Sequence, residues 1–245
     1  MKRMSQLTLA GLVGSAVVTA WAVPDATVKV ERTAGYFSTA TGYIGGEFTV
    51  KGHGATPLPT AWTAAYSPLA RVNGGFQSFS LERNESINGS PWHAYLNTAA
   101  VKGGTGGGSP DPISIGTAWL YKQFAQGQLT GYDYTPGPNR IASAQALQEA
   151  IWFLEDELTS IGSNPFISLV VSQFGSIANA KTNYSAATAG FHVVALNMYG
   201  VNKTTGATVW TAPKADMLMY LPDGGMTFAL LGGGLFGLYW IRRKD

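Results

Sequence analysis

Residues 144–158, AQALQEAIWFLEDEL, carry the strongest secondary-structure signal in this 245-residue chain. Apolar side chains recur there at intervals of three and four residues, at Ala144, Leu147, Ile151, Leu154 and Leu158. This spacing matches the helical repeat of about 3.6 residues and predicts an amphipathic helix with one buried face. Ser143 is the expected N-cap, because its hydroxyl can accept a hydrogen bond from a backbone N–H of the first turn.

Two further helices are predicted, one on each side of this stretch. Residues 115–126 have apolar positions at Ile115, Trp119, Leu120 and Phe124. Asn164 followed by Pro165 pairs a capping residue with a proline at the first helical position, which is typical of a helix start. This third helix is expected to continue through Phe166, Val170, Phe174 and Ile177.

Strand-like runs flank the helical region on both sides. Short β-branched and aromatic runs precede it at residues 28–31, 47–50, 76–81 and 92–96, and others follow at residues 191–199, 207–210 and 216–221. The Gly-rich residues 102–112 are predicted to form a loop. Strands, then helices, then strands predict an α+β fold, a mostly antiparallel β-sheet or sandwich body with about three inserted helices.

Residues 1–22 have the three parts of a secretory signal peptide. The basic start Met1-Lys2-Arg3 precedes an apolar run over residues 7–18, and Ala20 and Ala22 form an A-x-A cleavage site. Export through the Sec machinery and cleavage by signal peptidase after Ala22 would leave residues 23–221 as the secreted body. The alternative is an uncleaved N-terminal anchor, although the apolar run is short for a membrane span.

Residues 222–245 have the pattern of a membrane-inserted tail. The motif Leu221-Pro222-Asp223-Gly224-Gly225 precedes a hydrophobic segment, residues 226–241, and the basic stop Arg242-Arg243-Lys244. As a helix this segment covers about 24 Å, slightly less than a hydrocarbon core of about 30 Å. The basic stop is expected to stay cytoplasmic, which places the body outside the membrane.

The order of motif, hydrophobic segment and basic stop resembles the PEP-CTERM sorting tails of bacteria. The closest variant is VPDSG-CTERM, with Leu221 in the place of its usual Val. The resemblance implies an exosortase-like membrane protease that cleaves near Pro222-Asp223-Gly224 and delivers the body to the cell surface, the outer membrane or an extracellular matrix. The alternative is a permanent single-span anchor with the same topology.

The composition excludes several classes of protein and site. With no Cys in the chain, disulfides, Cys-ligated zinc, iron–sulfur clusters and Cys nucleophiles are impossible. Five of the 16 basic and two of the 14 acidic residues lie in the two ends, so the body has 11 basic and 12 acidic residues and a net charge of −1. These basic residues are scattered, which removes the electrostatic basis for nucleic-acid binding.

Candidate catalytic and metal-binding patterns do not combine into a site. His53, His93 and His192 lie far apart in the sequence, and none of them belongs to an HxH or HExxH metal-binding motif. The Gly-rich residues 103–108 are not followed by the Lys-Ser/Thr pair of a phosphate-binding loop. The acidic run at residues 155–157 ends its helix, where it opposes the helix dipole, and is expected to be a solvated patch. We therefore predict no catalytic residue, metal or cofactor, and a non-enzymatic protein.

The aromatic content suggests a surface for carbohydrate. The chain has seven Trp and 11 Tyr, and Trp62, Trp92 and Trp210 lie outside the predicted helix core positions. Trp62 and Trp92 are the candidate sugar-stacking residues, because aromatic faces pair well with apolar faces. An alternative function is thus a carbohydrate-binding module or a polysaccharide-active enzyme of the envelope, with extracellular polysaccharide as partner.

A second resemblance covers residues 76–158. Phe79-Ser80-Leu81-Glu82 and, later, Leu147-Gln148-Glu149-Ala150-Ile151-Trp152 look like the two motifs of bacterial thioester domains. In that family a strand Cys and a helix Gln form an internal thioester that traps amines covalently. The resemblance implies a thioester-domain-like body for an anchored surface protein.

Ser80 stands where the family has its Cys, so a thioester cannot form. Two interpretations of the degenerate pair Ser80 and Gln148 stay open. In the first, the two side chains only satisfy each other by hydrogen bonding in a buried place. In the second, they form an ester, which requires an activated hydroxyl.

Together these patterns predict an exported, exosortase-sorted cell-surface or extracellular-matrix protein with a structural or adhesive role. Its expected course begins with transient anchoring in the inner membrane by the C-terminal helix.

Overall fold

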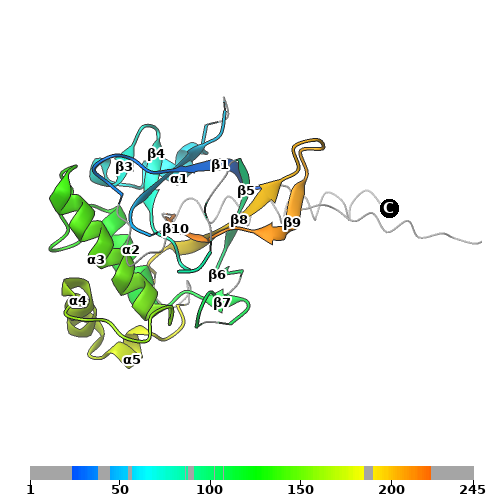
Figure 1. Ribbon diagram of the computed structural model, residues 1–245. Coiled ribbons are helices and arrows are strands. Elements are labelled where there is room, and N and C mark those ends of the chain that lie inside the picture. The colour runs from blue at the N-terminus through cyan, green and yellow to red at the C-terminus, as the bar shows by residue number, and fades with distance from the viewer. Residues whose placement is uncertain are drawn as a thin grey trace, which may run out of the picture.

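An antiparallel sheet forms the body of the protein, with the longer helices gathered on one side of it (Figure 1). The computed structural model describes residues 24–37, 45–54, 57–85, 87, 91–101, 103–106, 108–184 and 190–221. In chain order the elements are β1 (Ala26–Glu31), β2 (Phe48–Gly52), α1 (Thr60–Ala64), a 3-10 turn (Pro68–Ala70), β3 (Arg71–Val72), β4 (Gly75–Ser78), β5 (Trp92–Asn97), β6 (Ala99–Ala100), β7 (Asp111–Pro112), α2 (Ile115–Ala125), α3 (Pro138–Leu154), α4 (Pro165–Phe174), α5 (Ile177–Ala180), β8 (Val193–Val201), β9 (Thr208–Pro213) and β10 (Met217–Tyr220).

The main sheet has the strand order β10-β8-β5-β1-β2-β4-β3, with β9 paired to β8 and every pairing antiparallel. Its two ends meet, because the chain just after β4 pairs with β10. The Leu218 N–H donates to the Phe79 carbonyl at 3.0 Å, and the Leu81 N–H donates to the Asp216 carbonyl at 2.9 Å. Ser80 and Met217 form the bridge between these bonds, so the sheet closes on itself at Ser80.

The core lies between the closed sheet and the helices. Helix α2 packs against β8 and β10, and its Phe124 meets Phe79 edge-to-face, with ring centroids 5.0 Å apart. Leu147 and Ile151 of α3 are fully buried, as the helical spacing predicts. The α+β prediction of a mostly antiparallel β body with inserted helices is confirmed.

The central helix begins earlier and ends earlier than its sequence period indicates. Gly137 is the N-cap and Pro138 the first residue of α3, so the prediction of Ser143 as N-cap is wrong. The Ser143 hydroxyl instead accepts a hydrogen bond from Asp133 N–H at 3.1 Å. The helix ends at Leu154, with Asp156 at a positive φ of 61°, so Leu158 lies beyond it.

The flanking helices follow the sequence more closely. Ser114 caps α2 through its hydroxyl, and Asn164 caps α4 with Pro165 at the first helical position. The third helix was expected to reach Ile177, but it stops at Phe174 because Gly175 adopts the left-handed conformation at φ 80°. Ile177 opens the separate short helix α5.

The predictions for the two ends fall outside the described residues. They are the signal peptide of residues 1–22 with its Ala20 and Ala22 cleavage site, the tail of residues 222–245 and the segment 226–241 within it. Within the described parts, no helix has the length and apolar character needed to cross a membrane. Leu221, the first residue of the sorting motif, is described: it is buried, and its N–H donates to the His192 carbonyl at 2.8 Å.

Candidate functional site

The structure brings Ser80 and Gln148 together where the sheet closes against α3. Both residues are almost completely buried, with 1% and 0% of their surface exposed. The Gln148 Nε2 donates to the Ser80 carbonyl at 2.8 Å, and the Ser80 N–H donates to Gln148 Oε1 at 3.2 Å. The Gly46 N–H donates to the same Oε1 at 3.3 Å. Gln148 therefore joins α3 to two segments of the sheet through backbone groups.

The Ser80 hydroxyl has a different partner from the Gln148 carboxamide. Ser80 Oγ donates to the Glu82 carbonyl at 2.7 Å. A backbone carbonyl accepts a hydrogen bond but does not remove the proton, so this contact does not activate the hydroxyl as a nucleophile. The contact predicted between the two residues exists, and it is made by the serine backbone.

Close packing fixes Gln148 from the other side. A side chain at Gly45 would collide with the ring of Trp152 and crowd Gln148 Cγ. The absence of a Cβ at this position lets the chain before β2 approach α3 closely enough for Gly46 to reach Gln148. The site thus depends on Gly45 and Trp152 as well as on the pair itself.

Two buried carboxyl groups, Glu82 and Asp216, lie beside Ser80 at the sheet closure. The Asp216 N–H donates to Glu82 Oε2 at 2.9 Å, and the Val101 N–H donates to Asp216 Oδ2 at 2.5 Å. Burial, together with the neighbouring Asp216 charge, raises the pKa of Glu82 well above its usual range. Burial raises the pKa of Asp216 to about 7. The pair therefore retains a proton at neutral pH, because two buried carboxylates in contact repel each other.

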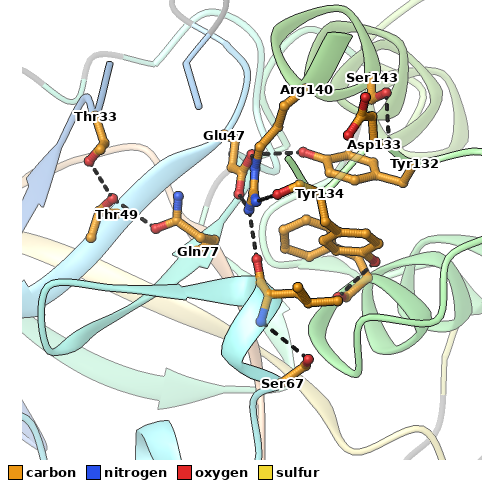
Figure 2. Close-up of polar contacts among 12 residues, drawn as sticks. Thr33, Glu47, Thr49, Ser67, Gln77, Tyr132, Asp133, Tyr134, Arg140 and Ser143 are labelled. Atoms are coloured by element: carbon orange, nitrogen blue, oxygen red, sulfur yellow. Dashed lines mark hydrogen bonds and ion pairs between the residues drawn. The ribbon is translucent and has the colours of Figure 1, made fainter. Parts of the chain in front are cut away.

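A buried ion pair holds the chain on the far side of Gly46. Figure 2 shows Arg140 of α3 facing Glu47, with Tyr132 and Tyr134 beside them. Arg140 Nε and Nη2 donate to Glu47 Oε2 at 2.9 Å and Oε1 at 2.5 Å. The Tyr132 hydroxyl also donates to Glu47 Oε2, at 2.8 Å. Both charged side chains have at most 1% of their surface exposed.

Further polar contacts surround the Arg140–Glu47 ion pair, at Arg140 and across β2. Arg140 also donates to the carbonyls of Leu69 and Tyr134. Across β2, Thr49 Oγ1 donates to Gln77 Oε1 at 2.7 Å and lies 2.8 Å from Thr33 Oγ1 (Figure 2). All of these groups join structural segments, and the sequence pattern did not reveal them because Glu47 and Arg140 are 93 residues apart.

The acidic run at residues 155–157 differs from the solvated patch expected of it. Glu155 is buried and accepts the Ser114 N–H at 3.1 Å, at the start of α2. Glu157 is buried and accepts the N–H groups of Arg83 at 2.8 Å and Thr105 at 2.7 Å. Only Asp156 is at the surface, paired with Lys181. Because α3 ends at Leu154, these residues turn back toward loop N–H groups that carboxylates can satisfy.

The prediction of sugar stacking at Trp62 and Trp92 is contradicted by their burial. Trp62 on α1 is 5% exposed and Trp92 on β5 is 2% exposed. Both rings belong to the hydrophobic core, so neither can offer a face to a ligand. Trp210 of β9, which the sequence also left outside the helix core, is 39% exposed.

A surface pocket and a possible metal site were the other candidates for a functional site. A surface pocket of about 310 Å³ lies at the β3–β4 turn, lined in part by Thr63, Arg71 and Asn73, and Ser80 is not among its lining residues. Among the described residues, no cluster of three or more His, Asp or Glu side chains could hold a metal ion.

Comparison of the chain with protein-family models, with curated proteins and with solved structures finds no match.

Proposed function

We propose that this chain is an exported surface or extracellular-matrix protein with a structural or adhesive role. Its body has the plan of a thioester domain but acts as a non-reactive module. Three parts of the sequence support the proposal: the signal-peptide pattern of residues 1–22, the sorting motif that begins at Leu221, and the motifs around Ser80 and Gln148.

The observation that carries the non-reactive role is the bonding of Gln148. Its carboxamide oxygen and nitrogen are held by the backbone of Ser80 and by Gly46 N–H. The Ser80 hydroxyl donates to the Glu82 carbonyl, an acceptor that does not withdraw its proton. A serine hydroxyl without a general base is a weak nucleophile, and a carboxamide is a poor acyl donor. Ser80 and Gln148 therefore join the helix to the sheet and carry out no chemistry.

The location follows from the processing signals. The body would pass through the Sec machinery, lose its signal peptide, and be held by segment 226–241 in the inner membrane. An exosortase-like protease would then cleave near Asp223 and release the body to the cell surface. The alternative, a permanent single-span anchor, keeps the same topology but retains the tail.

Cell fractionation of the full-length chain and of the Asp223→Ala variant tests this location. We expect the native chain in the surface or matrix fraction without its tail, and the variant in the inner-membrane fraction with its tail. Asp133→Ala is the matched control, since Asp133 is a half-buried aspartate of the body whose carboxylate accepts a local turn hydrogen bond from Thr135 N–H. Tail-bearing native protein in the inner membrane would support the permanent anchor, and native protein in the cytoplasm would refute export.

A test of reactivity complements this experiment. The purified full-length chain is incubated with methylamine, an amine that opens internal thioesters and activated esters. We expect no adduct at Gln148, because the carboxamide is already in its unreactive form. A methylamide at Gln148 would show that the residue is an acyl donor and would overturn the non-reactive role.

A further inference from the structure

Three aromatic rings from three strands meet on the side of the sheet away from the helices. They are Tyr95 of β5, Tyr199 of β8 and Trp210 of β9, which we call the aromatic cluster. Ring centroids lie 4.9 Å apart between Tyr95 and Trp210, 4.9 Å between Tyr199 and Trp210, and 5.7 Å between the two tyrosines. Figure 1 shows the β8–β9 hairpin extending from the body on the side opposite α3, α4 and α5.

The strand register explains why this cluster faces outward. Ala94 and Met198, next to the two tyrosines in sequence, are fully buried in the core. Because successive strand residues point to opposite faces, Tyr95 and Tyr199 lie on the outer face of the sheet. Among the described residues, three large hydrophobic side chains are exposed, and Trp210, at 39% exposure, is the aromatic one. Trp210 therefore packs against the two tyrosines and leaves part of its ring open to solvent.

A polar edge borders the rings. Thr208 Oγ1 lies 2.7 Å from His93 Nδ1 and 2.7 Å from the Tyr95 hydroxyl. These contacts fix the orientation of three polar groups beside the aromatic faces. Partial burial lowers the pKa of His93 below its usual value, so its imidazole is neutral at pH 7. The cluster and its polar edge therefore carry no net charge at neutral pH.

We propose that the aromatic cluster, with His93 and Thr208, binds a neutral carbohydrate chain. This inference rests on the proposed adhesive role and names the ligand class for it. The ring faces suit the apolar C–H faces of pyranose sugars, and the fixed hydroxyl and imidazole groups suit sugar hydroxyls.

The chemistry of the cluster favours a sugar over a protein partner. A stable protein interface needs about 800 Å² from each partner. The aromatic cluster offers one ring that is more than a third exposed, together with two partly covered tyrosines. A whole tryptophan side chain covers only about 150–250 Å², far below that figure, whereas stacking on a sugar ring needs a single aromatic face. The lack of charge also favours a neutral polysaccharide over an anionic one, which would require cationic side chains at the site.

Affinity electrophoresis of the full-length chain in a non-ionic detergent tests the proposal. The gels contain hydroxyethylcellulose, glucomannan or, as an anionic comparison, polygalacturonate. We expect the native chain to be retarded by at least one neutral polymer. Trp210→Ala should weaken that interaction by about tenfold, the effect of losing one well-placed aromatic contact, and Trp210→Phe should retain part of it.

Val171→Ala is the matched control, because Val171 of α4 is also an exposed hydrophobic residue, at 38% exposure. It should be retarded as strongly as the native chain. Far-ultraviolet circular dichroism establishes that all variants are folded. No retardation by either neutral polymer, retardation by polygalacturonate alone, or unchanged retardation of Trp210→Ala would overturn the proposal. Fractionation and amine-trapping results do not depend on Trp210, so failure here is distinguishable from failure of the proposed function.

Discussion

Replacing Gln148 by alanine is expected to destabilise the protein by far more than replacing Ser80 by alanine. Gln148→Ala removes three buried hydrogen bonds, to Ser80 O, Ser80 N–H and Gly46 N–H. It leaves those backbone groups without partners in a dry place. Each such loss costs about 1–3 kcal/mol, less where the site relaxes, so we expect a decrease of about 3–5 kcal/mol in the free energy of unfolding.

Ser80→Ala leaves these backbone bonds intact. It removes only the hydroxyl contact to the Glu82 carbonyl, which is worth about 1 kcal/mol. Urea unfolding of the full-length chain, followed by tryptophan fluorescence, measures both changes. Gln145→Ala is the matched control on the same helix, because the Gln145 amide contacts Glu149 in a partly exposed place; it should change stability by about 0.5 kcal/mol or less.

Two results would refute this reasoning. Equal effects of Gln148→Ala and Gln145→Ala would show that the buried bonds contribute nothing particular. A Ser80→Ala effect as large as that of Gln148→Ala would show that the serine hydroxyl, and not its backbone, holds the helix.

Two further predictions concern buried charge. Arg140→Met should lower the free energy of unfolding by about 3–5 kcal/mol, because Glu47 is left buried without its cationic partner. The double variant Arg140→Met/Glu47→Gln should recover part of that loss in the same urea assay. A double variant no more stable than the single one would contradict this. Burial raises the pKa of Glu155 to about 7, so the folded state binds a proton that the unfolded state has released above pH 5. Stability should therefore be highest near pH 4–5 and fall as the pH rises through 7, with about 3 kcal/mol of the fall due to Glu155 and a further part to Asp216. Glu155→Gln should make the fall smaller by about 3 kcal/mol, and an unchanged profile would argue against this.

The elements that were predictable from sequence are those with local signals. The spacing from Ala144 to Leu154 indicates a buried helical face, and Asn164-Pro165 marks a helix start that the structure confirms. The strand runs are short but alternate with Gly and Pro, which sufficed to predict the antiparallel body.

Features that depend on residues far away in the sequence could not be predicted from local patterns. Ser143 resembles an N-cap, yet Gly137 and Pro138 start the helix six residues earlier, because the intervening residues 139–142, NRIA, also tolerate helix. Trp62 is buried by packing of α1 against the sheet, which no local pattern reveals.

The candidate site was predictable in its residues but not in its bonding. The motifs around Ser80 and Gln148 led to the expectation of a contact between the side chains. In the structure, the Gln148 carboxamide forms its hydrogen bonds with the backbone of Ser80 instead. The direction in which a buried carboxamide points depends on how closely the neighbouring strands approach it, which the sequence does not show. The acids at 155 and 157 were misjudged for a related reason: their partners are loop N–H groups far away in sequence.

The central claim is that Ser80 and Gln148 are joined by hydrogen bonds and not by a covalent bond. Trypsin separates them into peptides of residues 72–83 and 141–181, which end at Arg83 and Lys181. Mass spectrometry of the digested full-length chain should show both peptides separately and at their unmodified masses. A single joined species lighter than their sum by one ammonia, about 17 Da, would show that an ester has formed and would contradict the account.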